Sequence, residues 1–338
     1  MNPAAAPSAR DLRLLHLDPR SGALRDRHVR DLPRLVRPGD VVVVNDAATL
    51  PASFAGRTAD GQELEVRLAG ANADGTWSAV LLGAGDWRQR TEDRPAPPAL
   101  PVGTPIAFGP GLAARVTAVS ALSPRLVTLA FGSAGSTLWS AFYRLGRPVQ
   151  YSYLRAALAL WDVQPFFASR PWAYEPASAG LALSARVMDG LRGAGAIMAT
   201  VTHAAGLSST GDPAIDAALP LRERYDVPEA TAQAVLAARA AGGRVVAVGT
   251  TVVRALEGAA ADGGGRLEAR TGWTAIRIDA GFRPRIVDAL FTGLHQRGET
   301  HFELLRAFAP DEALKAALDH AGHEGYLSHE FGDAMVVI

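Results

Sequence analysis

The chain has 338 residues, of which 48% are hydrophobic and 20% are charged, as in ordinary folded globular proteins. Its 34 Lys and Arg residues balance 34 Asp and Glu residues, which argues against a large nucleic-acid-binding surface because such surfaces are usually basic. It contains no cysteine, so disulfides, thiolate catalysis and cysteine-ligated metals are excluded.

The N-terminal segment, residues 1–9, lacks the apolar stretch of a signal peptide. No run in the chain reaches the ~18 apolar residues of a membrane helix, so we expect a cytoplasmic protein. Residues 12–17 and 41–44 are predicted strands. Between them, arginines alternate with aspartates over residues 18–40. We interpret this stretch as a solvated face of mixed charge, and the alternative is a patch that contacts phosphate.

From residue 56 to residue 131 the pattern changes to short β-like runs, at residues 64–68, 77–82, 113–119 and 126–131, separated by Gly, Asp and Pro turns. This spacing is typical of a small barrel or sandwich. Afterwards the α/β pattern returns. The sequence therefore predicts an α/β main domain, residues 1–55 and 140–338, that is interrupted by an inserted small β-barrel domain, residues 56–139. The cleft between the two is the default ligand site.

The C-terminal part alternates predicted helices and strands. The helices are expected at residues 154–161, 186–191, 230–241, 304–308 and 314–318. The strands are expected at residues 197–202, 245–248, 275–278 and 334–338.

The stretch from Arg244 to Glu257 is the most informative of the chain. A buried strand ends at Gly249, and Thr250 or Thr251 is predicted to cap the helix that follows. Free N–H groups and hydroxyls then lie at the carboxyl edge of a sheet, where open α/β sheets bind polar or anionic ligands. The alternative is an ordinary strand-to-helix turn, which recurs throughout α/β proteins.

Other polar residues follow apolar runs. Asn45 and Asp46 end the strand at residues 41–44. Ser178 and Gly180 lie in a turn of small residues, Thr292 and His295 follow another apolar run, and Asp333 lies in a turn before the final strand. We interpret His320, His323 and His329, with Glu324, as surface residues, because their spacing matches no strong metal-ligand pattern.

Four ordered segments resemble one family. Residues 38–56 resemble the pattern "pGDLLVfNDTRViPARl.G", residues 244–257 "RViAVGTTsvRtLE", residues 287–295 "vDaliTNFH", and residues 330–337 "SYGDAMLI". These are patterns of the S-adenosylmethionine:tRNA ribosyltransferase-isomerases of queuosine biosynthesis.

The resemblance implies an α/β domain with an inserted β-barrel and S-adenosylmethionine as a substrate. Its ribosyl part passes to the aminomethyl group of a 7-deazaguanine base in tRNA, adenine and methionine leave, and the ribose rearranges to an epoxycyclopentanediol. Asp46 or His295 would be the base, and Asp333 would hold a hydroxyl or orient His295. The implied donor site comprises Asn45, Ser178, Gly180, Gly249, Thr250, Thr251, Arg254 and Thr292. No metal is expected.

Several family residues are missing. Ala182 replaces a histidine, a second histidine is either lost or shifted by one residue to His203, only Glu223 remains of "HMHSE", and the lysine after His295 is absent. Three hypotheses stay open: an authentic tRNA enzyme, a relative that modifies a small deazapurine-type acceptor, and a non-catalytic relative that binds S-adenosylmethionine or RNA. Because charge is balanced and these residues are lost, we expect weak tRNA affinity.

Overall fold

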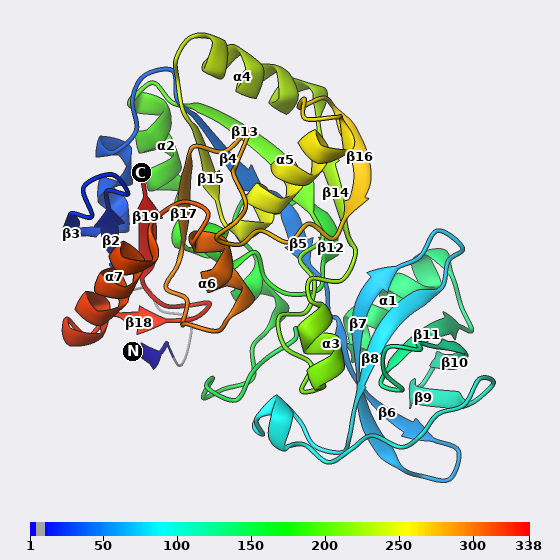
Figure 1. Ribbon diagram of the computed structural model, residues 1–338. Coiled ribbons are helices and arrows are strands. Elements are labelled where there is room, and N and C mark those ends of the chain that lie inside the picture. Colours follow the sequence, from blue (N-terminus) through cyan, green and yellow to red (C-terminus); the bar gives the residue numbers. More distant parts are fainter. Residues whose placement is uncertain (5–10) are drawn as a thin grey trace.

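The computed structural model describes residues 1–4 and 11–338. The prediction that residues 1–9 are not a signal peptide concerns a segment of which residues 5–9 lie outside the described residues. Figure 1 shows an α/β part and, beyond one edge of its sheet, a separate β-barrel. In the described part of the chain, no helix has the length and apolar character needed to cross a membrane.

The α/β part is built on a sheet with nine described strands. Four neighbours, β13, β4, β15 and β17, run parallel, and antiparallel pairs flank them. In spatial order the strands are β16 (Arg270–Thr274), β14 (Glu223–Val227), β13 (Ile197–His203), β4 (Val41–Asn45), β15 (Val245–Val248), β17 (Ala289–Gly293), β19 (Ala334–Val337), β2 (Arg13–Leu17) and β3 (Leu24–His28).

The central strands are apolar on both faces because both faces are covered. In β4, Val41 and Val43 join one core cluster, whereas Val42 and Val44 join another on the opposite face. The first cluster lies beneath α4 (Glu229–Ala240), α5 (Thr250–Asp262) and α7 (Asp311–His323). The second lies beneath η1 (Val29–Arg34) and α2 (Ala185–Gly193).

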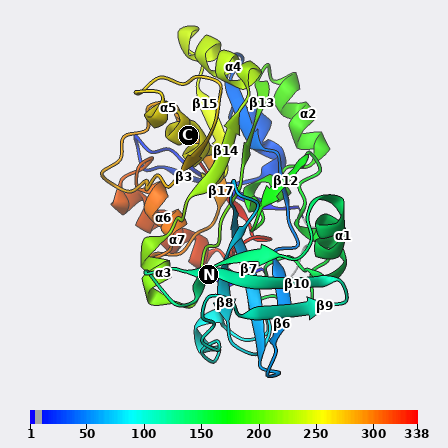
Figure 2. The same ribbon diagram turned by 90° about the vertical axis from the view of Figure 1, so that its right-hand side faces the viewer.

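The barrel is closed by six described strands, with a bulge in β10. Around the barrel these are β10 (Leu112–Val119), β11 (Leu126–Phe131), β8 (Trp77–Leu82), β7 (Glu63–Ala71), β6 (Ser53–Thr58) and β9 (Pro105–Gly109). Helix α1 (Gly135–Leu145) lies beside the barrel (Figure 2) and contributes Phe142 to an aromatic cluster with Phe54, Trp77 and Phe131.

The predicted fold class is confirmed: an α/β part carries an inserted barrel. The division at residues 56 and 139 remains a proposal, because the barrel strands begin at Ser53 and α1 packs with them up to Leu145. The remaining elements are short: β1 (Asn2–Pro3), β5 (Ala47–Thr49), β12 (Arg170–Ala173), β18 (Leu327–Ser328), η2 (Thr91–Asp93), η3 (Leu160–Val163), η4 (Ser178–Ala182), α3 (Pro213–Ala218) and α6 (Thr300–Leu305).

Two predicted elements were wrong, and the helix predicted at residues 304–308 is displaced, because α6 ends at Leu305. Residues 154–161 form irregular chain and the start of η3, not an α-helix, and Leu154, Leu158 and Leu160 pack around Trp87 and Phe331. Residues 275–278 have no strand pairing; the strand lies just before them, at β16. In both places the apolar spacing reflects burial without the expected backbone hydrogen bonds.

Candidate functional site

The carboxyl ends of the four parallel strands meet at one edge of the sheet. Asn45 ends β4, His203 ends β13, Gly249 follows β15, and Thr292 lies near the end of β17. The chain leaves β4 at this edge and reaches the barrel through β5. The edge is where open α/β sheets bind ligands.

Asn45 ties three elements together at this edge. Its Nδ2 donates to the His203 carbonyl at 3.0 Å and to Thr251 Oγ1 at 3.2 Å. Its Oδ1 accepts from the N–H groups of Ala47 at 3.0 Å and His203 at 2.9 Å. All of its side-chain donors and acceptors therefore have protein partners, and Asn45 fixes the ends of β4 and β13 and the start of α5 relative to one another.

Helix α5 begins at Thr250, and Gly249 is its N-cap residue. The predicted threonine cap is wrong, because no side chain caps the helix and both threonines lie in its first turn. Gly249 has φ 94°, a conformation that suits glycine. A Cβ at this position would lie 3.3 Å from the Cβ of Ala179, so the turn packs closely on η4.

Arg254 lies one turn into α5 and points to a buried carboxylate. Its Nη2 donates to Glu223 Oε1 at 2.5 Å, and Glu223 also accepts from the Gly206 N–H at 2.7 Å. Burial raises the pKa of Glu223, which Arg254 partly opposes. His203 Nε2 is 3.3 Å from Glu223 Oε2. Because burial and the Arg254 charge lower the pKa of His203 well below its usual value, that contact is not an ion pair at pH 7.

A cavity of about 210 Å³ lies between η4, the end of β17 and the segment before β19. Three predicted site residues line it: Ser178, Thr292 and Asp333. Gly180 is buried in η4 beside the cavity wall, where a Cβ would lie 3.1 Å from the Phe167 ring. The predicted residues Asn45, Gly249, Thr250, Thr251 and Arg254 do not line the cavity.

His295 is joined to the cavity by Thr292. The Thr292 Oγ1 lies 2.8 Å from His295 Nε2, and His295 Nδ1 lies 3.8 Å from Glu299 Oε2. The ring of His295 stacks on that of His301, with 4.9 Å between centroids. Burial, His295 and Arg254 together lower the pKa of His301 well below its usual value. The ring that packs against His295 is therefore the neutral imidazole of His301.

Asp46 and Asp333, the two predicted catalytic aspartates, lie apart from each other. Asp46 Oδ1 accepts from Thr202 Oγ1 at 2.5 Å, and its Oδ2 accepts from Ser169 Oγ at 2.8 Å. Asp333 accepts from the N–H groups of Arg13 and Leu327, both at 2.9 Å. Asp333 thus fixes the chain around the cavity, and its contact with a substrate hydroxyl or with His295 stays a prediction.

Among the cavity residues that sequence reasoning did not place in the site are His329 and Glu330. His329 was wrongly assigned to the surface; it lines the cavity and stacks on Tyr153 with 4.5 Å between ring centroids. Both belong to the segment around the terminal family pattern, but the pattern alone does not tell which way a turn faces. Among the described residues, no group of three or more His, Asp or Glu is arranged to hold a metal ion.

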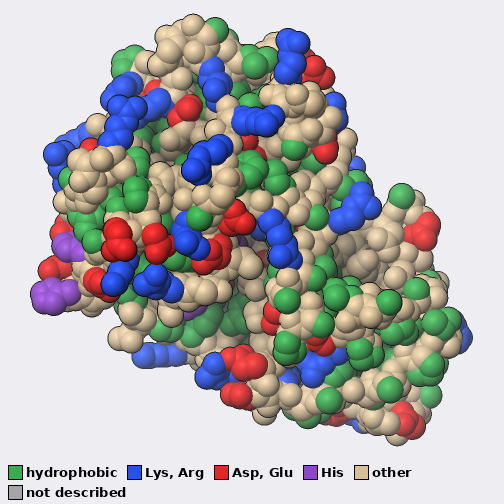
Figure 3. Space-filling model, viewed as in Figure 1, with side chains coloured by type: hydrophobic (Ala, Val, Ile, Leu, Met, Phe, Trp, Pro, Cys, Tyr) green, Lys and Arg blue, Asp and Glu red, His purple; other side chains and the backbone are tan. Residues whose placement is uncertain are grey.

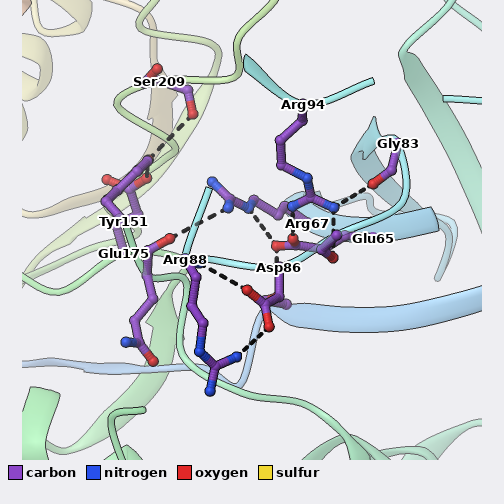
Figure 4. A network of polar contacts seen from close by, with 12 residues as sticks. Glu65, Arg67, Gly83, Asp86, Arg88, Arg94, Tyr151, Glu175 and Ser209 are labelled. Carbon is purple, nitrogen blue, oxygen red and sulfur yellow. Dashed lines mark hydrogen bonds and ion pairs between the residues drawn. The ribbon is translucent and has the colours of Figure 1, made fainter. Parts of the chain in front are cut away.

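A second buried polar network joins the barrel to the α/β part (Figure 4). Glu65 of β7 lies between Arg67 and Arg94, and the Arg67 guanidinium lies 5.3 Å from the centre of the Tyr151 ring. The Tyr151 hydroxyl donates to Glu175, which also accepts from the Ser208 N–H at 3.0 Å. Burial raises the pKa of Glu175. This network fixes the barrel beside the carboxyl edge of the sheet.

Comparison with known proteins decides the family. The sequence profile described as "Queuosine biosynthesis protein" matches residues 2–337. The chain belongs to this family. The resemblance seen in the four segments is thereby confirmed.

Members of the queuosine biosynthesis family with curated names are similar over nearly the whole chain. The S-adenosylmethionine:tRNA ribosyltransferase-isomerase of Moorella thermoacetica is 34% identical over 333 residues, which cover 96% of this chain and 92% of that protein. The enzyme of the same name from Nitrobacter winogradskyi is 36% identical and covers 96% and 91%. The crystal structure of S-adenosylmethionine tRNA ribosyltransferase from Thermotoga maritima has a TM-score of 0.54 at 23% identity, covering 99% and 96%, and shares the fold.

Proposed function

We propose that this chain uses S-adenosylmethionine as a ribosyl donor in queuosine biosynthesis. The ribosyl part passes to the aminomethyl group of a 7-deazaguanine acceptor and rearranges to an epoxycyclopentanediol, while adenine and methionine are released. The proposal is supported by membership of a family whose curated relatives are named S-adenosylmethionine:tRNA ribosyltransferase-isomerases. It makes the chain a transferase and isomerase.

The observation that carries the donor assignment is the charge of the cavity. Its lining includes the carboxyl groups of Asp162, Glu330 and Asp333 and, among described residues, no Lys or Arg. A sulfonium cation complements such a lining, whereas a phosphate would be repelled. S-adenosylmethionine is a ribosyl donor of this kind, because its methionine part is attached to the ribose through a sulfonium.

The cavity accommodates part of the donor. Its volume of about 210 Å³ is below the roughly 300–1,000 Å³ of pockets that enclose a whole ligand. We therefore place the sulfonium and the ribose in the cavity, against Ser178 and Thr292. The rest of the donor extends along the carboxyl edge of the sheet, past the Gly249 turn.

We assign the base role to His295. Thr292 connects its Nε2 to the cavity, and the Glu299 carboxylate lies 3.8 Å from its Nδ1. Asp46 has both carboxylate oxygens engaged by hydroxyls and does not line the cavity. In this proposal Asp46 orders the edge of the sheet, and Asp333 holds the cavity wall.

The acceptor is a 7-aminomethyl-7-deazaguanine, carried either on tRNA or as a smaller molecule. Balanced charge favours the smaller acceptor. In Figure 3, basic and acidic side chains are interspersed over the visible face. The names of the relatives favour tRNA. With either acceptor, the reaction would take place in the cytoplasm.

Donor binding is expected to stabilise the protein. At a concentration 100 times its dissociation constant, S-adenosylmethionine should add ~2.7 kcal/mol to the free energy of unfolding. Calorimetry and thermal unfolding with increasing ligand measure this. ATP serves as the control because it shares the adenosine but carries phosphates, which the acidic cavity should reject. Absence of both heat and thermal shift at millimolar S-adenosylmethionine would contradict the proposal.

A further inference from the structure

Glu330 is the cavity carboxyl group that has one buried oxygen, Oε2, without a hydrogen-bond partner among the described residues. Glu330 belongs to the segment that connects β18 to β19, and it lines the cavity. By contrast, Asp333 accepts from two backbone N–H groups, and Asp162 Oδ2 accepts from the Ala159 N–H at 2.8 Å. A buried carboxyl oxygen without a partner is costly unless a ligand supplies one.

The backbone before Glu330 is held in an unusual conformation. His329 has φ 67° and is the one non-glycine residue with positive φ in residues 1–4 and 11–338. Its ring is fixed by stacking on Tyr153. Such strained positions cluster where a side chain must be aimed, and here the next residue is Glu330.

The surroundings of Glu330 do not neutralise it. The titratable groups on the same cavity are Asp162 from η3, and His329 and Asp333 from its own segment, with His295 and Glu299 beyond His329. Burial lowers the pKa of His329, so at pH 7 its ring adds little positive charge. Burial also raises the pKa of Glu330 to about 7, as expected for a carboxyl group without a cation nearby.

We propose that Glu330 supplies the negative charge that selects a sulfonium donor over its neutral thioether analogue. The inference rests on the proposed function, since it places the donor's sulfonium in this cavity. The cation takes the position that the protein leaves unfilled beside Oε2. A bound cation in turn favours the ionised form of Glu330.

The test compares the affinities of S-adenosylmethionine and S-adenosylhomocysteine, which differ in the sulfonium methyl group and its charge. Isothermal titration with wild type and Glu330→Gln measures both ligands. The wild type should prefer S-adenosylmethionine, and Glu330→Gln should reduce that preference by about tenfold. Glu330→Asp, which keeps the charge, should retain part of the preference. Glu268→Gln removes an exposed carboxyl group and should leave the preference unchanged.

The pH dependence gives a second readout. Between pH 6 and pH 8, the wild-type preference should grow as Glu330 ionises, whereas it should stay flat in Glu330→Gln. Both ligands share the α-amino group, so its titration cancels in the ratio. A preference that is equal in wild type and Glu330→Gln, when both bind the ligands, overturns this inference alone. If the wild type binds neither ligand, the proposed function fails as well.

Discussion

Replacing Glu65 with glutamine is expected to lower the free energy of unfolding by about 3–5 kcal/mol, the usual cost of breaking a buried ion pair. Glu65 accepts from Arg67 Nε at 2.7 Å and also contacts Arg94, and both guanidinium groups are buried (Figure 4). Burial alone would raise the pKa of Glu65, but the two arginines outweigh it and hold the pKa below its usual value. Glutamine leaves two buried cations without a counter-charge.

Glu63→Gln is the matched control for this substitution. Glu63 lies two residues away on the same strand, is exposed, and pairs with Arg57 at 2.5 Å. Such a surface pair contributes only about 0–1 kcal/mol. Urea unfolding measures both variants. A loss in Glu65→Gln no larger than that in Glu63→Gln would show that the network does not stabilise the barrel junction.

The ion pairs of Glu65 with Arg67 and Arg94 also predict how the stability of the protein changes with pH. A carboxyl group whose folded-state pKa is lowered contributes stability above its unfolded pKa of about 4.3 and loses it as pH falls. The wild type should therefore lose stability more steeply than Glu65→Gln as the pH falls below about 5. The difference in free energy of unfolding between the wild type and Glu65→Gln should therefore become smaller in acid.

Truncating Arg254 to alanine is expected to cost about 3 kcal/mol of stability. Its guanidinium is the cation that faces the buried Glu223 carboxylate, with 2.5 Å between Arg254 Nη2 and Glu223 Oε1. The sequence predicted a direct contact of Arg254 with the donor. Because Arg254 does not line the cavity, we expect any loss of donor affinity to follow from displacement of the α5 turn.

Arg25→Ala is the control, because Arg25 is exposed on β3. Substitutions at such surface positions usually change the free energy of unfolding by less than about 0.5 kcal/mol. The double variant Arg254→Ala, Glu223→Gln should lose less stability than the sum of the single variants, because the second change removes the unpaired carboxylate. A coupling of about 0.5–3 kcal/mol is typical of such contacts. Additive losses, or equal small losses in Arg25→Ala and Arg254→Ala, would count against this role.

Much of the fold could be predicted because its signals are local. The valine runs at residues 41–44 and 245–248 are buried on both faces, and an unbroken apolar run of that length predicts a central strand. Residues 154–161 were misjudged because Leu154, Leu158 and Leu160 have the spacing of a helix while they pack around Trp87 from irregular chain and the start of η3. Periodicity reports burial, and it does not report which backbone hydrogen bonds form.

The site was predictable only where its contacts are short in sequence. Thr292 and His295 are three residues apart in one predicted motif, and their side chains meet in the structure. The pairs Glu223 with Arg254 and Tyr151 with Glu175 join separate elements, so the sequence shows each residue but not its partner. Glu330 was overlooked because its significance depends on which way the turn before β19 faces.

The most direct test of the central claim is the release of adenine from S-adenosylmethionine by the purified protein. Chromatography follows adenine and methionine, with 7-aminomethyl-7-deazaguanine supplied either free or in tRNA. We predict that both products appear in equal amounts and only when an acceptor is present, and that the free acceptor is used at least as well as tRNA. Release with tRNA alone would make tRNA the acceptor, whereas no adenine with either acceptor would contradict the ribosyl-transfer function itself.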